Sequence, residues 1–217
     1  MKKVVVFDFD DTLVKSLKCW YYTMDKLTFL ECGLQPDKSF STKRNHLGND
    51  EIAQKFLETT GLDLTINQVK QMWFKNMEYF YSKKIKMLKG AKQYLEYLKN
   101  KGYKICIASA TDLELLTKAI EIFDLKFLID EIYTETTIGY SKRNIKFLEA
   151  LLNKLNIDKD EMFYFEDSYA SLSNAIKHDI DSTCIKTNFN KVYFNELKQK
   201  CKLVIKNYKN KKLYQIL

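Results

Sequence analysis

Short apolar runs alternate with stretches of helical periodicity along most of the chain. The first run, Val4-Val5-Val6-Phe7, is rich in β-branched residues, which is typical of a strand buried on both faces of a parallel sheet. We predict strands at 4–9, 104–108, 129–133, 162–165 and 183–185. One helical face between them comprises Leu113, Leu116, Ala119, Ile120 and Phe123, and a second comprises Ile145, Leu148, Leu151, Leu152 and Leu155. From residue 90 onward this alternation predicts a parallel sheet with right-handed crossovers.

Residues 15–85 do not follow that alternation. Two helical stripes run through this segment, one formed by Leu17, Trp20, Tyr21, Met24 and Leu27, and the other by Ile66, Val69, Met72, Trp73, Met77 and Phe80. No strand pattern separates them, so we predict an all-helical cap at 15–85, with an α/β core formed by 1–14 and 86–217. Because the insertion follows the first strand, we expect it over the carboxyl edge of the sheet, as a lid that excludes water.

Carboxylates follow directly after the first strand, in the run Asp8-Phe9-Asp10-Asp11-Thr12-Leu13. In open α/β sheets, ligands bind at the carboxyl ends of the strands. Side chains alternate along a strand, so Asp8 and Asp10 are expected on one side and Asp11 on the other. Two acids held close together repel each other, and a divalent cation is the simplest compensation.

Composition limits the other classes of function. The chain has 217 residues, 46% of them apolar, which suits one substantial domain or a core with an insert. Its net charge is +8, but only Arg44 and Arg143 are arginine and the lysines are spread along the chain, so we favour a solvated surface over a nucleic-acid face. No apolar run approaches the ~20 residues of a membrane span. We expect a cytoplasmic protein with no nucleic-acid or membrane partner, and the sequence makes no prediction of its oligomeric state.

Four polar motifs each follow a predicted strand. They are Asp8-Phe9-Asp10-Asp11-Thr12, Ser109 after Ile105-Cys106-Ile107-Ala108, Lys142 after Tyr140-Ser141, and Glu166-Asp167-Ser168 after Phe163-Tyr164-Phe165. Together they resemble the motifs of the haloacid dehalogenase-like hydrolase superfamily, the first matching its DxDxT pattern, and the resemblance covers nearly the whole chain. The helical insertion matches the place of the family's cap. The fold so implied is a Rossmann-like three-layer α/β core with an all-α cap inserted after the first strand.

The resemblance also implies a chemistry, that of a Mg²⁺-dependent phosphatase acting on a small phosphorylated metabolite through an aspartyl-phosphate. Asp8 would be the nucleophile, and Asp10 would protonate the leaving alcohol and then activate water. The implied ligands of magnesium are Asp8, the Asp10 main-chain carbonyl and Asp167, with Glu166 close behind. The implied phosphate-binding groups are Ser109, Lys142 and the main-chain N–H of Ala110.

Each assignment has a structural alternative. Asp10 and Asp11 are also common helix-capping residues, and Ser109 alone is a common turn residue. Lys142 has many lysine neighbours, and Arg143 stands where the family lysine is often followed by proline. In the cap, the polar segment 42–49 resembles the family's specificity loop, where Arg44 and His46 are candidates for contact with an anionic substrate. An exposed loop between helices explains the same segment equally well.

Two further functions remain open. The first is a sugar phosphomutase of the β-phosphoglucomutase type, although Lys15 and Trp20 replace an aspartate and a histidine that such mutases carry. The second is a non-catalytic binding protein with the same fold, and Ser171, in place of a common glycine, adds slightly to that alternative. A dehalogenase is disfavoured because those enzymes lack the second acid of the first motif, which is Asp10 here.

Overall fold

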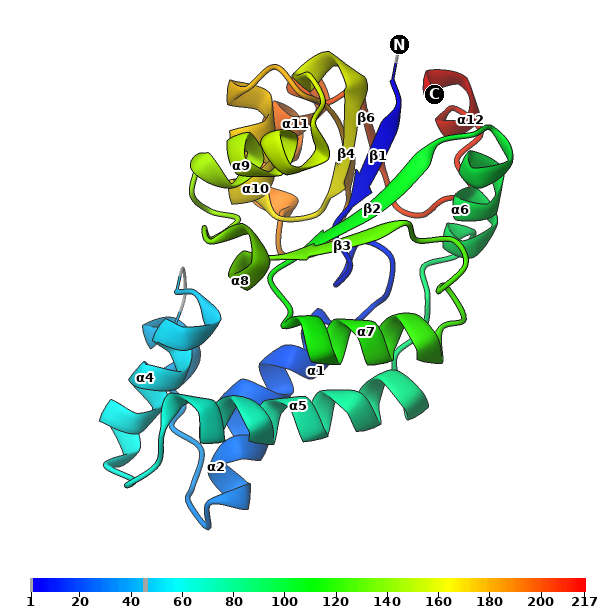
Figure 1. The fold of residues 1–217 in the computed structure, drawn as a ribbon. Helices are drawn as coiled ribbons and strands as arrows, with labels where there is room; N and C mark the ends of the chain where they lie inside the picture. The colour runs from blue at the N-terminus through cyan, green and yellow to red at the C-terminus, as the bar shows by residue number, and fades with distance from the viewer. Residues whose placement is uncertain (1, 45–46) are drawn as a thin grey trace. The chain divides into compact units, whose positions relative to one another are not determined.

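The apolar run after the N-terminus forms an inner strand of a six-stranded sheet (Figure 1). The computed structural model describes residues 2–44 and 47–217. The strand order is β3-β2-β1-β4-β5-β6, and every neighbouring pair is parallel. The strands are β1 (Val4–Phe7), β2 (Lys104–Ser109), β3 (Glu131–Thr134), β4 (Met162–Glu166), β5 (Asp181–Ile185) and β6 (Leu203–Ile205). This is the parallel α/β sheet that the sequence predicted.

The chain divides into two compact units. A sheet unit contains Met1–Lys15 and Lys86–Leu217, and a helical unit contains Ser16–Ile85. Within the helical unit, the elements are α1 (Leu17–Tyr22), the π-helix η1 (Thr23–Leu27), α2 (Thr28–Glu31), α3 (Phe40–Lys43), α4 (Asn49–Thr60) and α5 (Ile66–Lys83). The longest of them, α5, begins at the cap residue Thr65, whose hydroxyl accepts a hydrogen bond from the Gln68 N–H at 3.2 Å.

Three phenylalanine rings form the centre of the helical unit. Phe29 meets Phe56 edge to face at a centroid distance of 4.9 Å, and it meets Phe40 in the same way at 5.3 Å. All three side chains are buried. Edge-to-face contacts of this kind add to the free energy that burial of the rings already supplies. The helical unit therefore has a hydrophobic core of its own.

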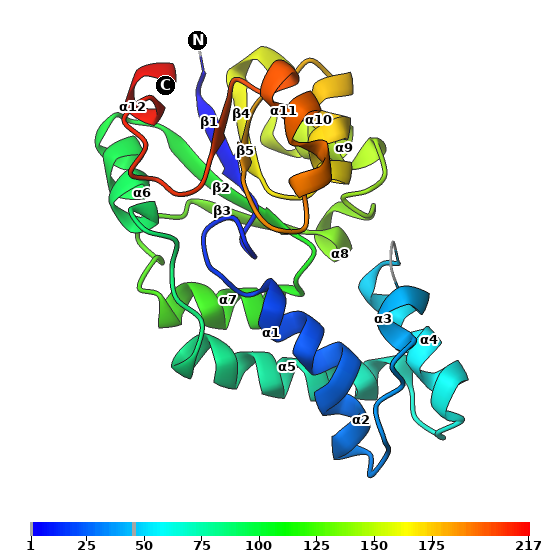
Figure 2. The ribbon, with the colours of Figure 1, turned by 180° about the vertical axis from the view of Figure 1, so that it is seen from behind.

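Helices cover both faces of the sheet (Figures 1 and 2). α6 and α12 lie on one face, and α9 and α10 lie on the other. The helices of this unit are α6 (Ala91–Asn100), α7 (Leu113–Ile122), α8 (Glu135–Ile138), α9 (Lys146–Leu155), the 3-10 turns η2 (Lys159–Glu161) and η3 (Lys191–Tyr193), α10 (Tyr169–Lys177), α11 (Phe194–Lys200) and α12 (Leu213–Ile216). The two layers follow from the strand order. The chain first adds β2 and β3 on one side of β1, and then β4, β5 and β6 on the other side. Right-handed crossovers in these two directions place the connecting helices on opposite faces of the sheet. No helix among the described residues is long and apolar enough to cross a membrane.

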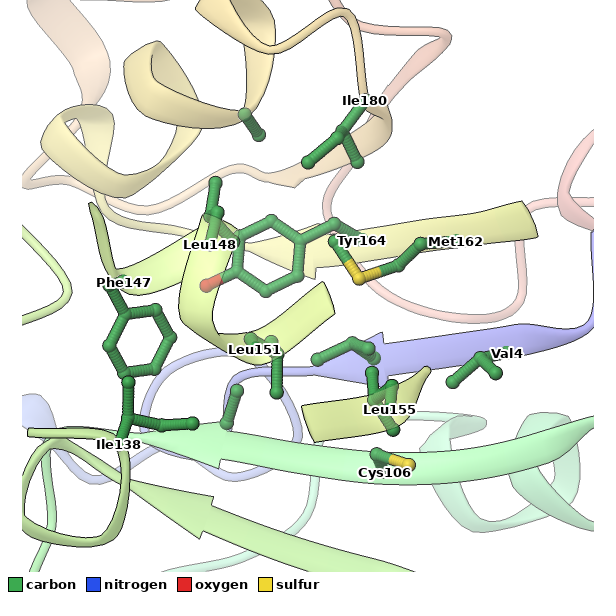
Figure 3. Close-up of a cluster of buried hydrophobic side chains, with 13 residues drawn as sticks. Val4, Cys106, Ile138, Phe147, Leu148, Leu151, Leu155, Met162, Tyr164 and Ile180 are labelled. Carbon is green, nitrogen blue, oxygen red and sulfur yellow. The ribbon is translucent and has the colours of Figure 1, made fainter. Parts of the chain in front are cut away.

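The face of the sheet under α9 holds a cluster of buried side chains (Figure 3). Phe147, Leu148, Leu151 and Leu155 of α9 pack there against strand residues that include Val4, Cys106, Met162 and Tyr164. The first residues of the two predicted helical faces, Leu113 and Ile145, are 43% and 39% exposed. Both stand where a helix begins, so the buried stripe starts a little later, at Leu115 in α7 and at Phe147 in α9.

A buried tyrosine from the C-terminal segment packs near the opposite face of the same strands. Tyr208 is fully buried, although it lies in a lysine-rich segment that reads as a surface terminus. Its ring lies 5.5 Å from that of Tyr94 in α6 and 6.0 Å from that of Phe165 in β4. Its hydroxyl donates to the Thr12 carbonyl at 3.1 Å. The C-terminal segment is therefore part of the core that supports the loop after β1.

Gly90 lies directly under this segment, and Gly90→Ala is expected to destabilise the protein. Gly90 has a φ of +81°, and an added Cβ would lie 3.1 Å from the Tyr208 backbone. Left-handed backbone and overpacking together should cost about 2–4 kcal/mol of unfolding free energy. Gly102→Ala is the matched control, because Gly102 has a φ of +83° and no atom within 4 Å of its added Cβ. That control should lose only about 1–2 kcal/mol. If urea unfolding shows equal losses of unfolding free energy in Gly90→Ala and Gly102→Ala, the close approach of Gly90 to the Tyr208 backbone is contradicted.

The strands differ from the prediction in two respects, one strand end and one missed strand. β1 ends at Phe7 rather than at residue 9, because the chain turns away from the sheet immediately after Asp8. The sixth strand, Leu203–Ile205, was missed. It has three residues and pairs on one side only, so its apolar run is too short to stand out from the surrounding lysines.

Candidate functional site

Asp8 lies at the carboxyl end of β1, where the ladder with β4 ends. Its N–H still donates to the Phe165 carbonyl at 2.9 Å, as the next bond of the ladder would. The chain then turns, since the N–H of Leu13 donates to the Phe9 carbonyl at 2.8 Å and Asp11 has a φ of 55°. Aspartate tolerates this left-handed conformation better than most residues do. The turn leaves Asp8 6% exposed, at the edge of the sheet where ligands bind in this class of fold.

Thr111, in the loop after β2, bonds to both Ser109 and Asp10. Ser109 is the last residue of β2 and is 1% exposed. The Thr111 N–H donates to the Ser109 hydroxyl oxygen at 3.1 Å. The Thr111 hydroxyl donates to Oδ2 of Asp10 at 2.6 Å. The β2 loop is thus bonded to the β1 loop through side chains that both lie at the strand ends.

Lys142 lies in the same place, 6% exposed, in the segment between α8 and α9. Its ammonium donates to Oδ1 of Asp8 at 2.6 Å and to the Ala108 carbonyl at 2.8 Å. It also forms an ion pair with Oε2 of Glu166 at 2.7 Å. The backbone around it is fixed as well, because the Lys142 N–H donates to Oε1 of Glu135 at 2.7 Å. A buried cation is stable in such a position only when carboxylates surround it.

Glu166 ends β4 and has all four of its acceptor positions occupied. Oε1 accepts from the N–H groups of Asp167 and Ser168, each at 2.9 Å. Oε2 accepts from the Tyr164 hydroxyl at 2.6 Å and pairs with Lys142. Tyr164 and Glu166 are two residues apart on one strand, so their side chains share a face. Figure 3 shows the Tyr164 hydroxyl pointing away from Met162, toward the carboxyl end of β4.

The buried charges shift one another's pKa values. Burial, followed by the negative charge of Glu166, raises the pKa of Asp8 to about 8. Burial and the charges of Glu166 and Asp8 raise the pKa of Asp167 well above its usual range. For Lys142 burial acts in the opposite direction, but the charges of Asp8 and Glu166 outweigh it and raise the pKa of this ammonium well above 10.5. The lysine therefore stays charged, while the two aspartates lack sufficient positive charge around them.

Three carboxylates of this group are close enough to hold one cation. Oxygens of Asp8, Glu166 and Asp167 lie within 4.8 Å of one another, and all three side chains are buried. Within the described part of the chain, no hydrogen-bond donor reaches the Asp167 carboxylate. The Asp167 backbone is held in place, because its carbonyl accepts from Nδ2 of Asn190 at 2.7 Å. An all-oxygen donor set of this kind fits Mg²⁺. Oδ2 of Asp10 accepts from Thr111, and the ligand predicted from Asp10 is its main-chain carbonyl.

Comparison with known families identifies the chain. A model of haloacid dehalogenase-like hydrolases matches residues 5–185. The chain belongs to this family. No relative was found among curated proteins by sequence comparison.

Several solved structures share the fold of this hydrolase. CbbY from Rhodobacter sphaeroides, in complex with phosphate, is 15% identical over 97% of this chain and 96% of that chain, with a TM-score of 0.81. A HAD hydrolase of family IA, variant 3, from Entamoeba histolytica is 20% identical over 95% and 94%, with a TM-score of 0.77. A predicted phosphoglycolate phosphatase from Haemophilus somnus is 15% identical over 99% and 98%, with a TM-score of 0.76. At these identities the likeness shows the fold alone.

The candidate substrate contacts of the helical unit have different outcomes. Arg44 of the hydrolase is 6% exposed, and its guanidinium donates to both carboxylate oxygens of Asp25, through NH2 at 2.7 Å and through Nε. Its planar group also lies 4.3 Å from the centre of the Tyr21 ring. These contacts give Arg44 a structural role inside the helical unit, which differs from both the predicted substrate contact and the exposed loop. His46 lies outside the described residues.

Four residues that hold the site together were missed by sequence reasoning. Thr111, Tyr164, Glu135 and Asn190 each bond to a predicted site residue or to its backbone. Only Tyr164 had a readable signal, because it alternates with Glu166 on a strand and carries a hydroxyl inside an apolar run. Thr111 and Asn190 act across separations of 101 and 23 residues, and Glu135 acts across seven residues that form no regular repeat. A single sequence gives no sign of which side chains such contacts will involve.

Proposed function

We propose that this hydrolase is a Mg²⁺-dependent phosphatase that acts on a small phosphorylated metabolite through an aspartyl-phosphate on Asp8. One observation supports this most. The buried ammonium of Lys142 donates to the Asp8 carboxylate at 2.6 Å. Carboxylate oxygens of Glu166 and Asp167 lie within 4.8 Å of an oxygen of Asp8. The Lys142 ammonium and a cation held by these carboxylates would together supply the positive charge that an anionic substrate beside an anionic nucleophile requires. The complex of CbbY with phosphate, a protein of the same fold, is consistent with the proposal.

Ser109, Ala110 and Lys142 are the proposed phosphate-binding groups. The Ser109 oxygen accepts from the Thr111 N–H, which leaves its own proton free to donate to a phosphoryl oxygen. The Ala110 N–H is proposed as a second donor. Lys142 would share its protons between Asp8 and the phosphoryl group, holding nucleophile and substrate together.

The proposed reaction has two balanced steps. A carboxylate oxygen of Asp8 attacks phosphorus, the bond from phosphorus to the ester oxygen breaks, and that oxygen takes a proton from Asp10. In the second step Asp10 takes a proton from water, the water oxygen attacks phosphorus, and the Asp8 carboxylate leaves. The products are the alcohol and inorganic phosphate. Asp10 is ready for a second cycle because it has returned to its protonated form.

Asp8, Asp167, the Asp10 main-chain carbonyl and Glu166 are the residues proposed to hold Mg²⁺. A bound magnesium ion supplies positive charge that screens the phosphoryl oxygens from the attacking carboxylate. The carboxylate set fits such an ion because Asp167 is buried without a donor of its own among the described residues. Glu166 already accepts three hydrogen bonds and pairs with Lys142, and we propose that its main task is to hold Lys142 and the β4 loop.

We also propose that residues 15–85 act as a cap on the core formed by 1–14 and 86–217. The support is the place of the insertion, which follows the loop that begins at Asp8 after β1, together with the independent core of the helical unit. Substrate selection would then depend on this unit. Lids of this kind exclude water and complete the site on closing.

Release of p-nitrophenol from p-nitrophenyl phosphate tests the proposed function. The purified chain should hydrolyse this ester with MgCl₂ and lose activity when EDTA removes the metal. A panel of phosphorylated sugars, nucleotides and small acids would then identify the substrate class. Conversion of a sugar phosphate to its isomer with a bisphosphate activator would indicate the phosphomutase alternative instead. No turnover of any phosphate ester would favour the non-catalytic binding protein.

Magnesium is expected to stabilise the fold more strongly at high pH than at low pH. Without metal, Asp8 has a pKa of about 8 in the folded chain against an ordinary 3.8, raised mainly by burial. The stability this group contributes is fully present below its ordinary pKa and is lost as the pH rises through 8. A bound cation needs the ionised carboxylate, so binding below that pH releases a proton.

The measurement is the melting temperature with and without a fixed MgCl₂ concentration. The increase should be several degrees larger at about pH 8.5 than at about pH 5.5. A KCl solution of the same ionic strength is the control, and it should not reproduce this difference. If MgCl₂ raises the melting temperature by the same amount at both pH values, the result argues against a site built from these carboxylates.

A further inference from the structure

The Thr111 side chain connects the two loops that contain the proposed acid–base and the proposed phosphate-binding serine. Thr111 follows β2 and is 4% exposed. Its hydroxyl donates to Oδ2 of Asp10 at 2.6 Å, across 101 residues of sequence. Its N–H donates to the Ser109 hydroxyl oxygen at 3.1 Å. One buried residue therefore touches both groups, and neither contact is part of the family's motif pattern that the sequence displayed.

We infer that Thr111 is a positioning residue that fixes the Asp10 carboxyl group, so that one of its two oxygens exchanges protons with the substrate. This inference rests on the proposed phosphatase function. The Thr111 hydroxyl has one proton, and it donates that proton to Oδ2 of Asp10. Oδ2 is thereby held in place by Thr111, and in this proposal Oδ1 carries the proton that passes to the leaving alcohol. The same bond holds the Asp10 side chain in one rotamer.

The reacting bonds follow from that arrangement. The proton on Oδ1 of Asp10 moves to the ester oxygen as the bond from phosphorus to that oxygen breaks, and Oδ1 keeps the electron pair. Thr111 exchanges no proton with the substrate. Its hydroxyl bond is kept while Asp10 is protonated and becomes stronger when Asp10 is charged, since hydrogen bonds to ionised acceptors are the stronger ones. Proton transfer from a well-placed acid contributes about 10²–10⁴-fold to such rates.

Thr111→Val removes the hydroxyl and keeps the branched shape, whereas Thr111→Ser keeps the hydroxyl. Both are assayed with phenyl phosphate, whose leaving group needs a proton, and with p-nitrophenyl phosphate, whose leaving group departs more readily without one. The comparison uses kcat/KM, which covers only the steps up to departure of the alcohol. Thr117→Val is the matched control, because among the residues that the structure describes the Thr117 hydroxyl bonds only to the Leu113 carbonyl within α7.

Thr111→Val should lower kcat/KM by about 10–100-fold for phenyl phosphate and by only a few-fold for p-nitrophenyl phosphate. Thr111→Ser and Thr117→Val should stay within about two-fold of the unmodified enzyme on both esters. Equal losses on the two esters would indicate a merely structural role and overturn the inference, as would no loss on either. An unmodified chain that hydrolyses neither ester would overturn the proposed function itself.

A double-variant comparison separates positioning from general damage to the fold. In an Asp10→Asn background the proposed acid is already absent, so Thr111→Val should change the remaining kcat/KM by less than about two-fold. A further ten-fold loss in that background would overturn the inference. If Thr111→Val does not fold, Thr111→Ala is read by the same ratio between the two esters.

Discussion

Replacing Asp8 by asparagine is expected to reduce phosphatase turnover by about 10⁴-fold or more, the scale of loss when a covalent nucleophile is removed. The amide of asparagine has the shape of the carboxyl group but is a far weaker nucleophile. Its carbonyl oxygen can still accept the Lys142 hydrogen bond that Oδ1 of Asp8 accepts at 2.6 Å. Asp8→Asn also removes one of the buried negative charges that raise each other's pKa values. The fold should therefore be retained, with a metal-free melting temperature equal to or above that of the unmodified chain.

The measurement is release of p-nitrophenol with magnesium, together with a melting curve. Asp11→Asn is the matched control, because Asp11 is the neighbouring acid of the same loop and asparagine tolerates its φ of 55°. That variant should keep activity within about ten-fold. Activity that persists in Asp8→Asn would remove Asp8 from the role of nucleophile, whatever the other motifs suggest.

Lys142→Met is expected to give the largest loss of stability among these variants. Lys142 is 6% exposed, and its ammonium is the positive charge that touches both Asp8 and Glu166. Removing one partner from a buried ion pair costs about 3–5 kcal/mol, because the remaining charge is left uncompensated. That loss is a large fraction of the stability of an ordinary domain. It should be largest above about pH 8, where the Asp8 carboxyl, with its raised pKa of about 8, is ionised, and smaller below that pH, where this carboxyl takes up a proton.

Urea unfolding of the metal-free protein at about pH 8.5, where the Asp8 carboxyl is mostly ionised, measures the effect. Lys146→Met is the control, because Lys146 is an exposed lysine four residues further on and should change the unfolding free energy by less than about 0.5 kcal/mol. Added MgCl₂ should recover part of the stability lost in Lys142→Met, since a bound cation supplies positive charge to the same carboxylates. Equal stability of the two variants would show that Lys142 does not compensate the buried acids.

Strand ends were the part of the site that the sequence revealed most clearly. A β-branched run followed by acids predicts both a buried strand and its polar carboxyl edge, and Asp8, Ser109 and Glu166 all lie where that logic puts them. Lys142 was harder, because many lysines surround it in sequence. Only the three-dimensional structure distinguishes it, by enclosing its ammonium among carboxylates.

Contacts between distant loops were the part that the sequence could not reveal. The bond from Thr111 to Asp10 depends on the parallel pairing of β1 and β2, which brings the two strand ends together. The same holds for Arg44, whose polar loop suggested an exposed ligand contact but whose side chain is paired with Asp25. An arginine in a polar segment has the same local pattern in both roles. Its partner is decided by packing rather than by spacing.

The contact between Tyr208 and the loop after β1 has a consequence for biosynthesis. The Thr12 carbonyl accepts from a hydroxyl that lies 196 positions later in the chain. A ribosome therefore makes the segment with Asp8 long before its buried support. Until Tyr208 has left the exit tunnel, the nascent polypeptide has no means of completing this corner. Nascent chains should gain activity only after that point, and chains truncated before Tyr208 should be inactive and readily degraded.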